Sequence, residues 1–252
     1  MYYFCHQINN ILDMKILLFF YEIFIMAPLL LLITILTTST VIIGGLIGDA
    51  SFWGYYPPKI WSKLFCIISL VKVEVKGREN IKPDESYVFV ANHQGAYDIF
   101  LVYGYLNHNF KWIMKHTLRK VPMVGKACEA AKHIFVDRTN PKAIKRTIEE
   151  AKKTLQGGMS VVIFPEGTRS ADGKIKKFKR GAFQIAVDLN MPVVPMTIDG
   201  SYKILSKSSF FVNPGKLTLQ IHKPIIPPAE GFDIDTLVEE SYNQVKSGLK
   251  EN

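Results

Sequence analysis

Residues 87–98 read Tyr-Val-Phe-Val-Ala-Asn-His-Gln-Gly-Ala-Tyr-Asp, and they join an apolar run to a group of polar side chains. The first five residues are mostly β-branched or aromatic, which is typical of a strand. A histidine follows this run at once, and an aspartate comes five positions after the histidine. We therefore predict a strand over 87–91 that carries His93 just beyond its carboxyl end.

Strands and helices alternate on both sides of this stretch, which predicts an α/β fold with a mixed, largely parallel sheet flanked by helices. The predicted strands are 71–75, 112–114, 133–136, 161–164, 193–198 and 217–221. The predicted helices are 99–106, 181–189, a segment after Asp233, and one capped by Asn140, begun by Pro141 and ended by Gly157-Gly158.

Polar residues follow the predicted strands at their carboxyl ends. These residues are His93, Lys115, Arg138 and Glu166. Ligands of open α/β sheets bind beyond the carboxyl ends of the strands. The shared placement therefore predicts one site.

His93 and Asp98 form a candidate acid–base pair. Five positions along a helix rotate a side chain by about 140°, so the pair would not share one helix face. With His93 in the loop and Asp98 in the first helical turn, the carboxylate can accept the Nδ1 proton and leave Nε2 free to take a proton. The alternative is a structural histidine beside a helix-capping aspartate. Asn92 and the small pair Gly95-Ala96 favour the functional reading because they are expected to open space around the imidazole.

A second run, Phe164-Pro165-Glu166-Gly167-Thr168-Arg169-Ser170, suggests an anion site. Gly167 permits a tight turn whose N–H groups can receive an oxyanion, and Arg169 offers a bidentate donor for phosphate. Glu166 is expected to accept a hydrogen bond from a substrate hydroxyl. The alternative is a surface turn with a solvated arginine. No serine or cysteine occupies a nucleophile elbow, so the two runs predict base-assisted attack by a hydroxyl of a phosphate-bearing substrate.

The amino-terminal part is apolar from Ile16 to Gly48, with Glu22 as its single charge. This length exceeds the about 20 residues that span a bilayer and the core of a signal peptide. We predict a retained anchor, either one tilted helix or a helix broken near Pro28, with Met14 as an alternative start. The predicted division is 1–70 for the anchor and an interfacial helix, and 71–252 for the α/β domain. The interfacial helix is predicted from its aromatic and lysine residues, Phe52, Trp53, Tyr55, Tyr56, Lys59, Trp61 and Lys63, and from the helical spacing of Trp61, Leu64, Phe65 and Ile68.

The net charge of +9 suits anionic lipid, nucleic acid or phosphorylated substrates, and the adjacent anchor favours lipid. No zinc-finger or basic-zipper pattern is present, so no nucleic-acid partner is expected. Cys5, Cys66 and Cys128 are scattered, which argues against disulfides and a metal site and fits a reducing compartment. His108, His116, His133 and His222 show no comparable pattern and are expected to be structural or surface residues.

Four segments in order resemble the sequence blocks of the glycerophospholipid acyltransferase family, most closely its 1-acylglycerol-3-phosphate acyltransferases. The first is His93 to Asp98, the His-x-x-x-x-Asp motif. The second is Lys115, 121–125 and 135–138. The third is 164–170, and the fourth is 191–196.

The resemblance implies that His93, oriented by Asp98, deprotonates a glycerol hydroxyl that attacks an acyl thioester. Glu166, Gly167, Thr168 and Arg169 would hold the glycerol phosphate with Lys115 and Arg138, and the fourth block would border the acyl chain. It implies acyl-CoA or acyl carrier protein as donor, lysophosphatidate as acceptor, phosphatidate as product, no metal or cofactor, and a membrane-associated enzyme with its catalytic domain on the cytoplasmic face. Alternatives are another lysophospholipid or glycerol 3-phosphate as acceptor, a membrane-bound lipid hydrolase, and a non-enzymatic lipid-binding protein.

Overall fold

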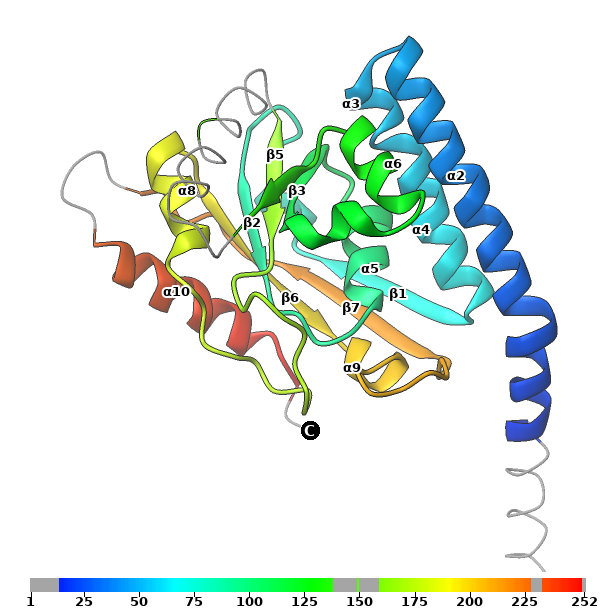
Figure 1. The fold of residues 1–252 in the computed structure, drawn as a ribbon. Coiled ribbons are helices and arrows are strands. Elements are labelled where there is room, and N and C mark those ends of the chain that lie inside the picture. The colour runs from blue at the N-terminus through cyan, green and yellow to red at the C-terminus, as the bar shows by residue number, and fades with distance from the viewer. Residues whose placement is uncertain (1–13, 138–148, 150–158, 228–232, 251–252) are drawn as a thin grey trace, which may run out of the picture.

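A seven-stranded sheet with helices on both faces forms the body of the protein (Figure 1). The computed structural model describes residues 14–137, 149, 159–227 and 233–250. The strands are β1 (Val71–Lys76), β2 (Val88–Ala91), β3 (Phe110–Lys115), β4 (Ile134–Val136), β5 (Ser160–Ile163), β6 (Val193–Asp199) and β7 (Gly215–Ile221). Their order in the sheet is β1-β7-β6-β2-β5-β3-β4.

The central strands β6, β2, β5, β3 and β4 run parallel, whereas β7 is antiparallel to β6 and β1 is parallel to β7. The predicted mixed, largely parallel sheet is therefore confirmed. The parallel run brings the carboxyl ends of β2, β3 and β5 to one edge.

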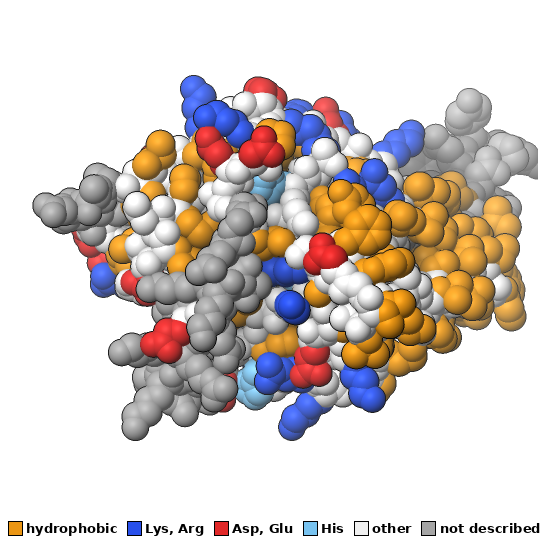
Figure 2. Space-filling model, turned by 90° about the horizontal axis from the view of Figure 1, so that it is seen from above, with side chains coloured by type: hydrophobic (Ala, Val, Ile, Leu, Met, Phe, Trp, Pro, Cys, Tyr) orange, Lys and Arg blue, Asp and Glu red, His pale blue; other side chains and the backbone are white. Residues whose placement is uncertain are grey.

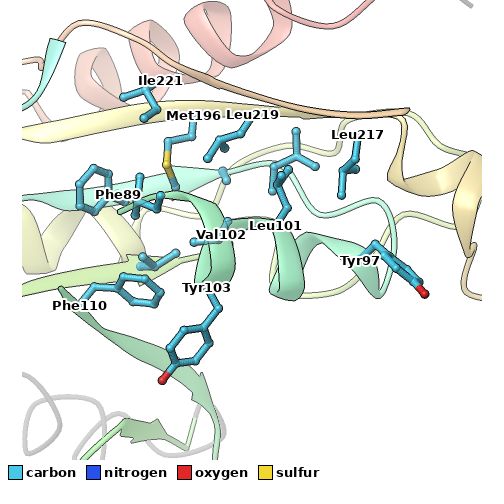
Figure 3. Close-up of a cluster of buried hydrophobic side chains, with 14 of the residues drawn as sticks. Phe89, Tyr97, Leu101, Val102, Tyr103, Phe110, Met196, Leu217, Leu219 and Ile221 are labelled. Atoms are coloured by element: carbon cyan, nitrogen blue, oxygen red, sulfur yellow. The ribbon is translucent and has the colours of Figure 1, made fainter. Parts of the chain in front are cut away.

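Alternating side chains of the central strands supply two separate cores. Phe89 and Val162 join the core on the face of α5 (Tyr97–Tyr105) and α4 (Tyr56–Ile68). Val88 and Val161 join the core under α8 (Gly181–Leu189) and α10 (Ile234–Ser247). A strand buried on both faces needs an apolar run without polar gaps, which is the pattern of β2 and β5. Figure 3 shows the first core, with Tyr103 of α5 extending from it.

The amino-terminal helix is continuous from Met14 to Ile47, and it is long and apolar enough to cross a membrane. Its last part is α2 (Ala27–Ile47), preceded by a π-helical turn, η1 (Glu22–Met26). Pro28 lies just after this turn, and a π turn is one way in which a helix accommodates the N–H that proline lacks. Of the two predicted arrangements, the structure shows the unbroken helix.

α2 packs on α4 and on α6 (Val124–Ala130), and α4 in turn packs on α5. Trp61 and Phe65 of α4 therefore face the protein: their rings contact each other and Phe100, and the Trp61 indole N–H donates to Thr34 Oγ1 over 2.9 Å. The exposed apolar side chains of α4 are Tyr56, Ile60 and Ile67. The spacing of Trp61, Leu64, Phe65 and Ile68 predicted that these residues form the interfacial face of the helix. The outward face is instead the one that carries Tyr56, Ile60 and Ile67.

Several boundaries differ from the sequence-based prediction. β3 begins at Phe110 rather than at residue 112, because Lys111 lies in the strand and is 2% exposed. Its Nζ donates to Ala131 O over 2.8 Å, so a buried charge interrupts the expected apolar run. α6, the short α3 (Ala50–Trp53) and α9 (Ser201–Ile204) were not predicted. The predicted helix from Asn140 to Gly158 lies outside the described residues apart from Glu149.

Candidate active site

His93 lies in the loop after β2 and Asp98 in the first turn of α5, as expected. His93 Nδ1 and Asp98 Oδ2 are 2.7 Å apart. The same oxygen accepts the N–H groups of Gln94 over 2.7 Å and Gly95 over 3.0 Å. The Asp98 side chain is fully buried, and three nitrogen atoms converge on its Oδ2. Because Nδ1 donates to it, Nε2 is left as the acceptor nitrogen.

The loop that carries His93 is fastened to the second run by three contacts. The imidazole stacks on the Phe164 ring, with centroids 4.1 Å apart and planes at 9°. The backbone N–H of His93 donates to Glu166 Oε1 over 2.8 Å, and the backbone carbonyl of His93 accepts the backbone N–H of Ser170 over 2.7 Å. The structure thus joins the two runs that the sequence separates by about 70 residues. The imidazole is held by Phe164 and Asp98, and the backbone of His93 by Glu166 and Ser170.

Glu166 is buried and supports the loop that carries His93 by accepting hydrogen bonds. The residue is 2% exposed, and its second oxygen, Oε2, accepts the Lys176 N–H over 3.1 Å. Burial raises the pKa of Glu166 to about 7 against the lowering effect of its two backbone hydrogen bonds. Both oxygens are engaged by the protein, and Glu166 is absent from the cavity wall described below. This placement differs from the expected contact with a substrate hydroxyl, and we expect Glu166 to position His93 instead.

Replacing Glu166 with alanine is expected to lower kcat and the melting temperature together, with little change in the KM of a phosphate-bearing substrate. The substitution leaves two buried N–H groups without a partner, at a cost of ~1–3 kcal/mol each. Steady-state kinetics and thermal unfolding measure both effects. Glu239→Ala removes an exposed carboxylate of α10 and serves as the control. A selective rise in KM would assign Glu166 to substrate binding.

Two cationic side chains and a turn lie beside His93. Lys115 ends β3, and Arg169 follows the turn at Gly167, where φ is +79°. Among the described residues, neither Lys115 nor Arg169 forms an ion pair with a carboxylate, and the N–H groups of Thr168 and Arg169 have no protein acceptor. These donors are therefore available to an oxyanion. Arg138, the other cation expected here, lies outside the described residues.

One cavity of about 590 Å³ connects these groups with the amino-terminal helix. His93, Lys115 and Gly167 to Arg169 lie on its wall together with Lys207. The rest of the wall comes from α2, α4, β3 and α6, and includes Thr34, Thr37, Thr38, Val41, Pro58, Trp61, Ile113, Met114, Val124, Ala127 and Cys128. Its size falls within the ~300–1,000 Å³ of small-molecule sites. The cavity is thus polar where the base and the cations lie and mostly apolar elsewhere.

A neutral histidine lies on the wall of the same cavity. Burial, and next the charge of Lys111, lower the pKa of His133 to about 3. Its Nδ1 accepts the Trp112 N–H over 3.3 Å, so Nε2 carries the proton and faces the Tyr103 hydroxyl at 3.2 Å. The Tyr103 hydroxyl donates to the Gly54 carbonyl. Both side chains are satisfied within the protein, in agreement with the structural role expected for His133.

Asn92, Gly95 and the fourth block have roles other than those expected. Asn92 does not open space: its side-chain amide exchanges two 2.8 Å hydrogen bonds with the backbone of Ile198 and so ties β2 to β6. Gly95 lets α9 approach, because a Cβ there would lie 2.6 Å from the Ser201 carbonyl oxygen. The fourth block forms the start of β6, and none of its residues lies on the cavity wall.

One feature of the sequence indicates the cavity wall on the amino-terminal helix. Thr34, Thr37, Thr38 and Val41 recur at helical spacing inside an otherwise strongly apolar run. Such a stripe indicates a helix face turned toward protein rather than lipid. Lys207 carried no comparable signal, because it lies in a loop outside the four blocks.

No group of three or more His, Cys, Asp or Glu side chains in the described parts of the chain is arranged to hold a metal ion. Cys66 and Cys128 are free thiols, and Cys5 lies outside the described residues. The expectations of a reaction without metal or cofactor and of a reducing compartment stay predictions.

A histidine base next to anion donors, at one end of an apolar cavity, fits enzymes that pass an acyl group to a hydroxyl of an anionic acceptor. The model of the family described as Acyltransferase matches residues 72–199, and the chain belongs to this family. It is 34% identical over 201 residues to a chloroplastic 1-acyl-sn-glycerol-3-phosphate acyltransferase of Brassica napus, covering 77% of this chain and 56% of that protein. The alpha form of this enzyme in Mus musculus is 34% identical over 157 residues, covering 62% of this chain and 55% of that one. The chain therefore spans about half the length of these relatives.

The fold is also similar to a solved structure. The crystal structure of the 1-acyl-sn-glycerophosphate acyltransferase PlsC from Thermotoga maritima superposes with a TM-score of 0.76 at 29% identity. The match covers 93% of this chain and 95% of that one, so it includes both the sheet and helices outside the family match.

Proposed function

We propose that the protein transfers a fatty acyl group from a thioester, acyl-CoA or acyl carrier protein, to the free hydroxyl of 1-acylglycerol 3-phosphate, which yields phosphatidate. The observation that carries the proposal is the cavity on whose wall His93, the cationic side chains of Lys115, Arg169 and Lys207, and a long apolar surface lie together. The names of the similar enzymes from Brassica napus, Mus musculus and Thermotoga maritima agree with this substrate class.

In the proposed reaction His93 Nε2 accepts the proton of the acceptor hydroxyl. The hydroxyl oxygen attacks the thioester carbonyl, and collapse of the tetrahedral intermediate breaks the C–S bond. The proton then passes from the imidazolium to the leaving thiolate. Asp98, held at 2.7 Å from Nδ1, stabilises the imidazolium during these steps.

Arg169 and Lys115 are proposed to bind the acceptor's phosphate, with the free N–H groups of Thr168 and Arg169 as further donors. A planar guanidinium matches a phosphate with two parallel hydrogen bonds. Binding the phosphate places the glycerol hydroxyl near His93 because both partners line one cavity.

The apolar part of the cavity is proposed to hold an acyl chain. Its wall is shared by Val41 and Thr38 of the amino-terminal helix and Ala127 and Cys128 of α6. We further propose that this helix anchors the protein in a membrane, with the catalytic domain on the cytoplasmic side. An acyl chain could then pass from the bilayer to the base along the helix that anchors the protein.

The test is the dependence of thioester cleavage on the acceptor. With acyl thioester and lysophosphatidate, thiol release and phosphatidate formation are expected in equal amounts. With the acceptor omitted, thiol release is expected nearly to stop, because water has no phosphate by which it could be held at attack distance from the thioester. Free thiol is measured by a chromogenic disulfide and phosphatidate by mass spectrometry.

Two outcomes would change the assignment. Rapid thioester cleavage without acceptor would indicate a lipid hydrolase. Transfer to lysophosphatidylcholine or to glycerol 3-phosphate at the same rate as to lysophosphatidate would indicate a broader acyltransferase. The phosphate of lysophosphatidylcholine is a diester, and glycerol 3-phosphate lacks an acyl chain.

A further inference from the structure

The loop between α9 and β7, residues 205–214, holds two phenylalanines in solvent. We call it the aromatic loop. Phe210 is 94% exposed and Phe211 is 53% exposed, and Phe210 is the most exposed large apolar side chain of the described residues. Single exposed apolar side chains are common, whereas a contiguous exposed apolar patch marks an interaction site.

Hydrogen bonds hold this loop in its shape. The Asn213 N–H donates to the Ile204 carbonyl over 2.9 Å and closes the neck of the loop. At the tip, the Ser209 hydroxyl donates to the Phe211 carbonyl over 2.9 Å and accepts the Phe211 N–H over 3.2 Å. The exposure of the two rings is thus a property of an internally bonded loop.

The aromatic loop is fastened to the amino-terminal helix. The rings of Phe211 and Phe19 have centroids 5.7 Å apart, and the Val212 N–H donates to Glu22 Oε1 over 3.1 Å. Glu22 is the single charge of the apolar run and belongs to the π-helical turn η1. Its carboxylate is therefore paired with the loop rather than left alone in apolar surroundings.

The two segments form one apolar surface. Phe19, Phe20 and Phe24 are exposed on the helix beside the point where Phe211 touches it. Figure 1 shows the loop extending from α9 on the side of the amino-terminal helix, and Figure 2 shows apolar side chains covering that helix. Continuity with a helix that is apolar enough to cross a membrane selects lipid as the occupant of this surface.

Lysines flank the phenylalanines. Lys203 and Lys207 are both exposed, and Lys207 also lies on the cavity wall with Arg169. Phenylalanine side chains of a surface segment bury at the boundary between headgroups and acyl chains, and nearby lysines are attracted to an anionic lipid surface. A pair of phenylalanines with lysines behind them is the composition of a segment that enters the headgroup region.

We propose that the aromatic loop is a second membrane contact, whose Phe210 and Phe211 insert into the leaflet that holds the amino-terminal helix. In this position Lys207 lies at the lipid phosphates beside the cavity. The proposal rests on the proposed membrane anchoring, and it adds a lipid-binding segment outside the four sequence blocks.

Site-specific quenching tests the insertion in the full-length protein. Phe210→Cys, Phe24→Cys and Ile226→Cys are each labelled with a polarity-sensitive fluorophore in a chain that lacks its native cysteines. Each is reconstituted in phosphatidylcholine–phosphatidylglycerol vesicles that contain nitroxide-labelled acyl chains. Ile226 is the control: it is 73% exposed, and its neighbour Ile225 belongs to the core under α8 and α10.

We expect lipid nitroxides to quench the labels at Phe24 and Phe210 but not at Ile226. Quenching at Phe24 with none at Phe210 would overturn the proposal and leave the anchor in place. No quenching at Phe24 or at Phe210 would overturn both the insertion of the aromatic loop and the proposed anchoring by the amino-terminal helix. Cross-linking of Phe210→Cys between two chains would show that a second copy, not lipid, covers the loop.

A kinetic test distinguishes an effect of the loop on membrane binding from an effect on the acyl-transfer step. The double variant Phe210→Ser/Phe211→Ser is expected to raise the apparent KM for acceptor in vesicles at least about tenfold, since ~1.4 kcal/mol of lost insertion energy is tenfold in binding. Its rate with a short-chain, water-soluble acceptor is expected to match that of Ile226→Ser. Equal loss with both acceptors would show a structural role for the loop and would contradict the proposal.

Discussion

Alanine in place of His93 is expected to abolish acyl transfer in a protein that still folds. General-base catalysis contributes roughly 10²–10⁴-fold. Within the described part of the chain, the other hydrogen bonds to Asp98 come from the backbone N–H groups of Gln94 and Gly95, which cannot replace the imidazole. The structural losses are the stacking of His93 on Phe164 and the hydrogen bond between Nδ1 and Asp98. The contacts of the His93 backbone with Glu166 and Ser170 remain. Product formation measured with saturating acceptor and donor gives kcat, and thermal unfolding reports the fold.

Two companion variants sharpen this result. His93→Gln keeps a side chain of similar length but no base, and it should be as inactive as His93→Ala. Asp98→Asn should be nearly as severe, because an amide cannot hold the Nδ1 proton and accept the Gln94 and Gly95 N–H groups as a carboxylate does. If purified His93→Ala kept more than about a tenth of the wild-type rate, the assignment of the base would be wrong.

Arg169→Ala is expected to raise the KM of the phosphate-bearing acceptor by about 10–100-fold, while the KM of the acyl donor changes little. A hydrogen bond to a charged group contributes ~1.5–3 kcal/mol, and 1.4 kcal/mol is tenfold in affinity. Arg169→Lys should restore little of the loss, since an ammonium cannot form the paired contact. Lys115→Ala should act in the same direction. Initial rates with each substrate varied in turn give the two KM values.

The control for Arg169 is Arg180→Ala. Arg180 pairs with Asp235 at the surface and does not line the cavity, so its loss removes the same charge without touching the site. Equal rises in the KM of both substrates for Arg169→Ala would point to a structural role in the turn after β5.

The parts that could be predicted from sequence are those in which neighbours along the chain determine the geometry. β2 and β5 are short apolar runs, and their polar ends follow directly, so both strands and the position of His93 were predicted. The placement of Asp98 also follows locally, because a carboxylate in the first helical turn can return to a loop five residues earlier.

The other parts depend on contacts between distant segments. Glu166 looked like a substrate ligand because only the fold shows that both its oxygens meet the N–H groups of His93 and Lys176. The start of β3 was predicted too late because Lys111 interrupts the apolar run. Its burial depends on a hydrogen bond to a carbonyl 20 residues away, which the sequence does not show. The cavity wall on α2 and the bond between Glu22 and Val212 join segments that no local pattern connects.

The helix that contains Thr34 to Val41 is long and apolar enough to cross a membrane, and it also forms one wall of the cavity. A helix whose apolar length exceeds the local hydrocarbon thickness adjusts by tilting. Tilting of this helix moves Thr34, Thr38 and Val41 relative to α6 and β3, which belong to the rest of the protein. If the helix spans the bilayer as proposed, we expect the width of the cavity to change with membrane thickness, and the preferred acyl-chain length to change with the lipid composition around the protein.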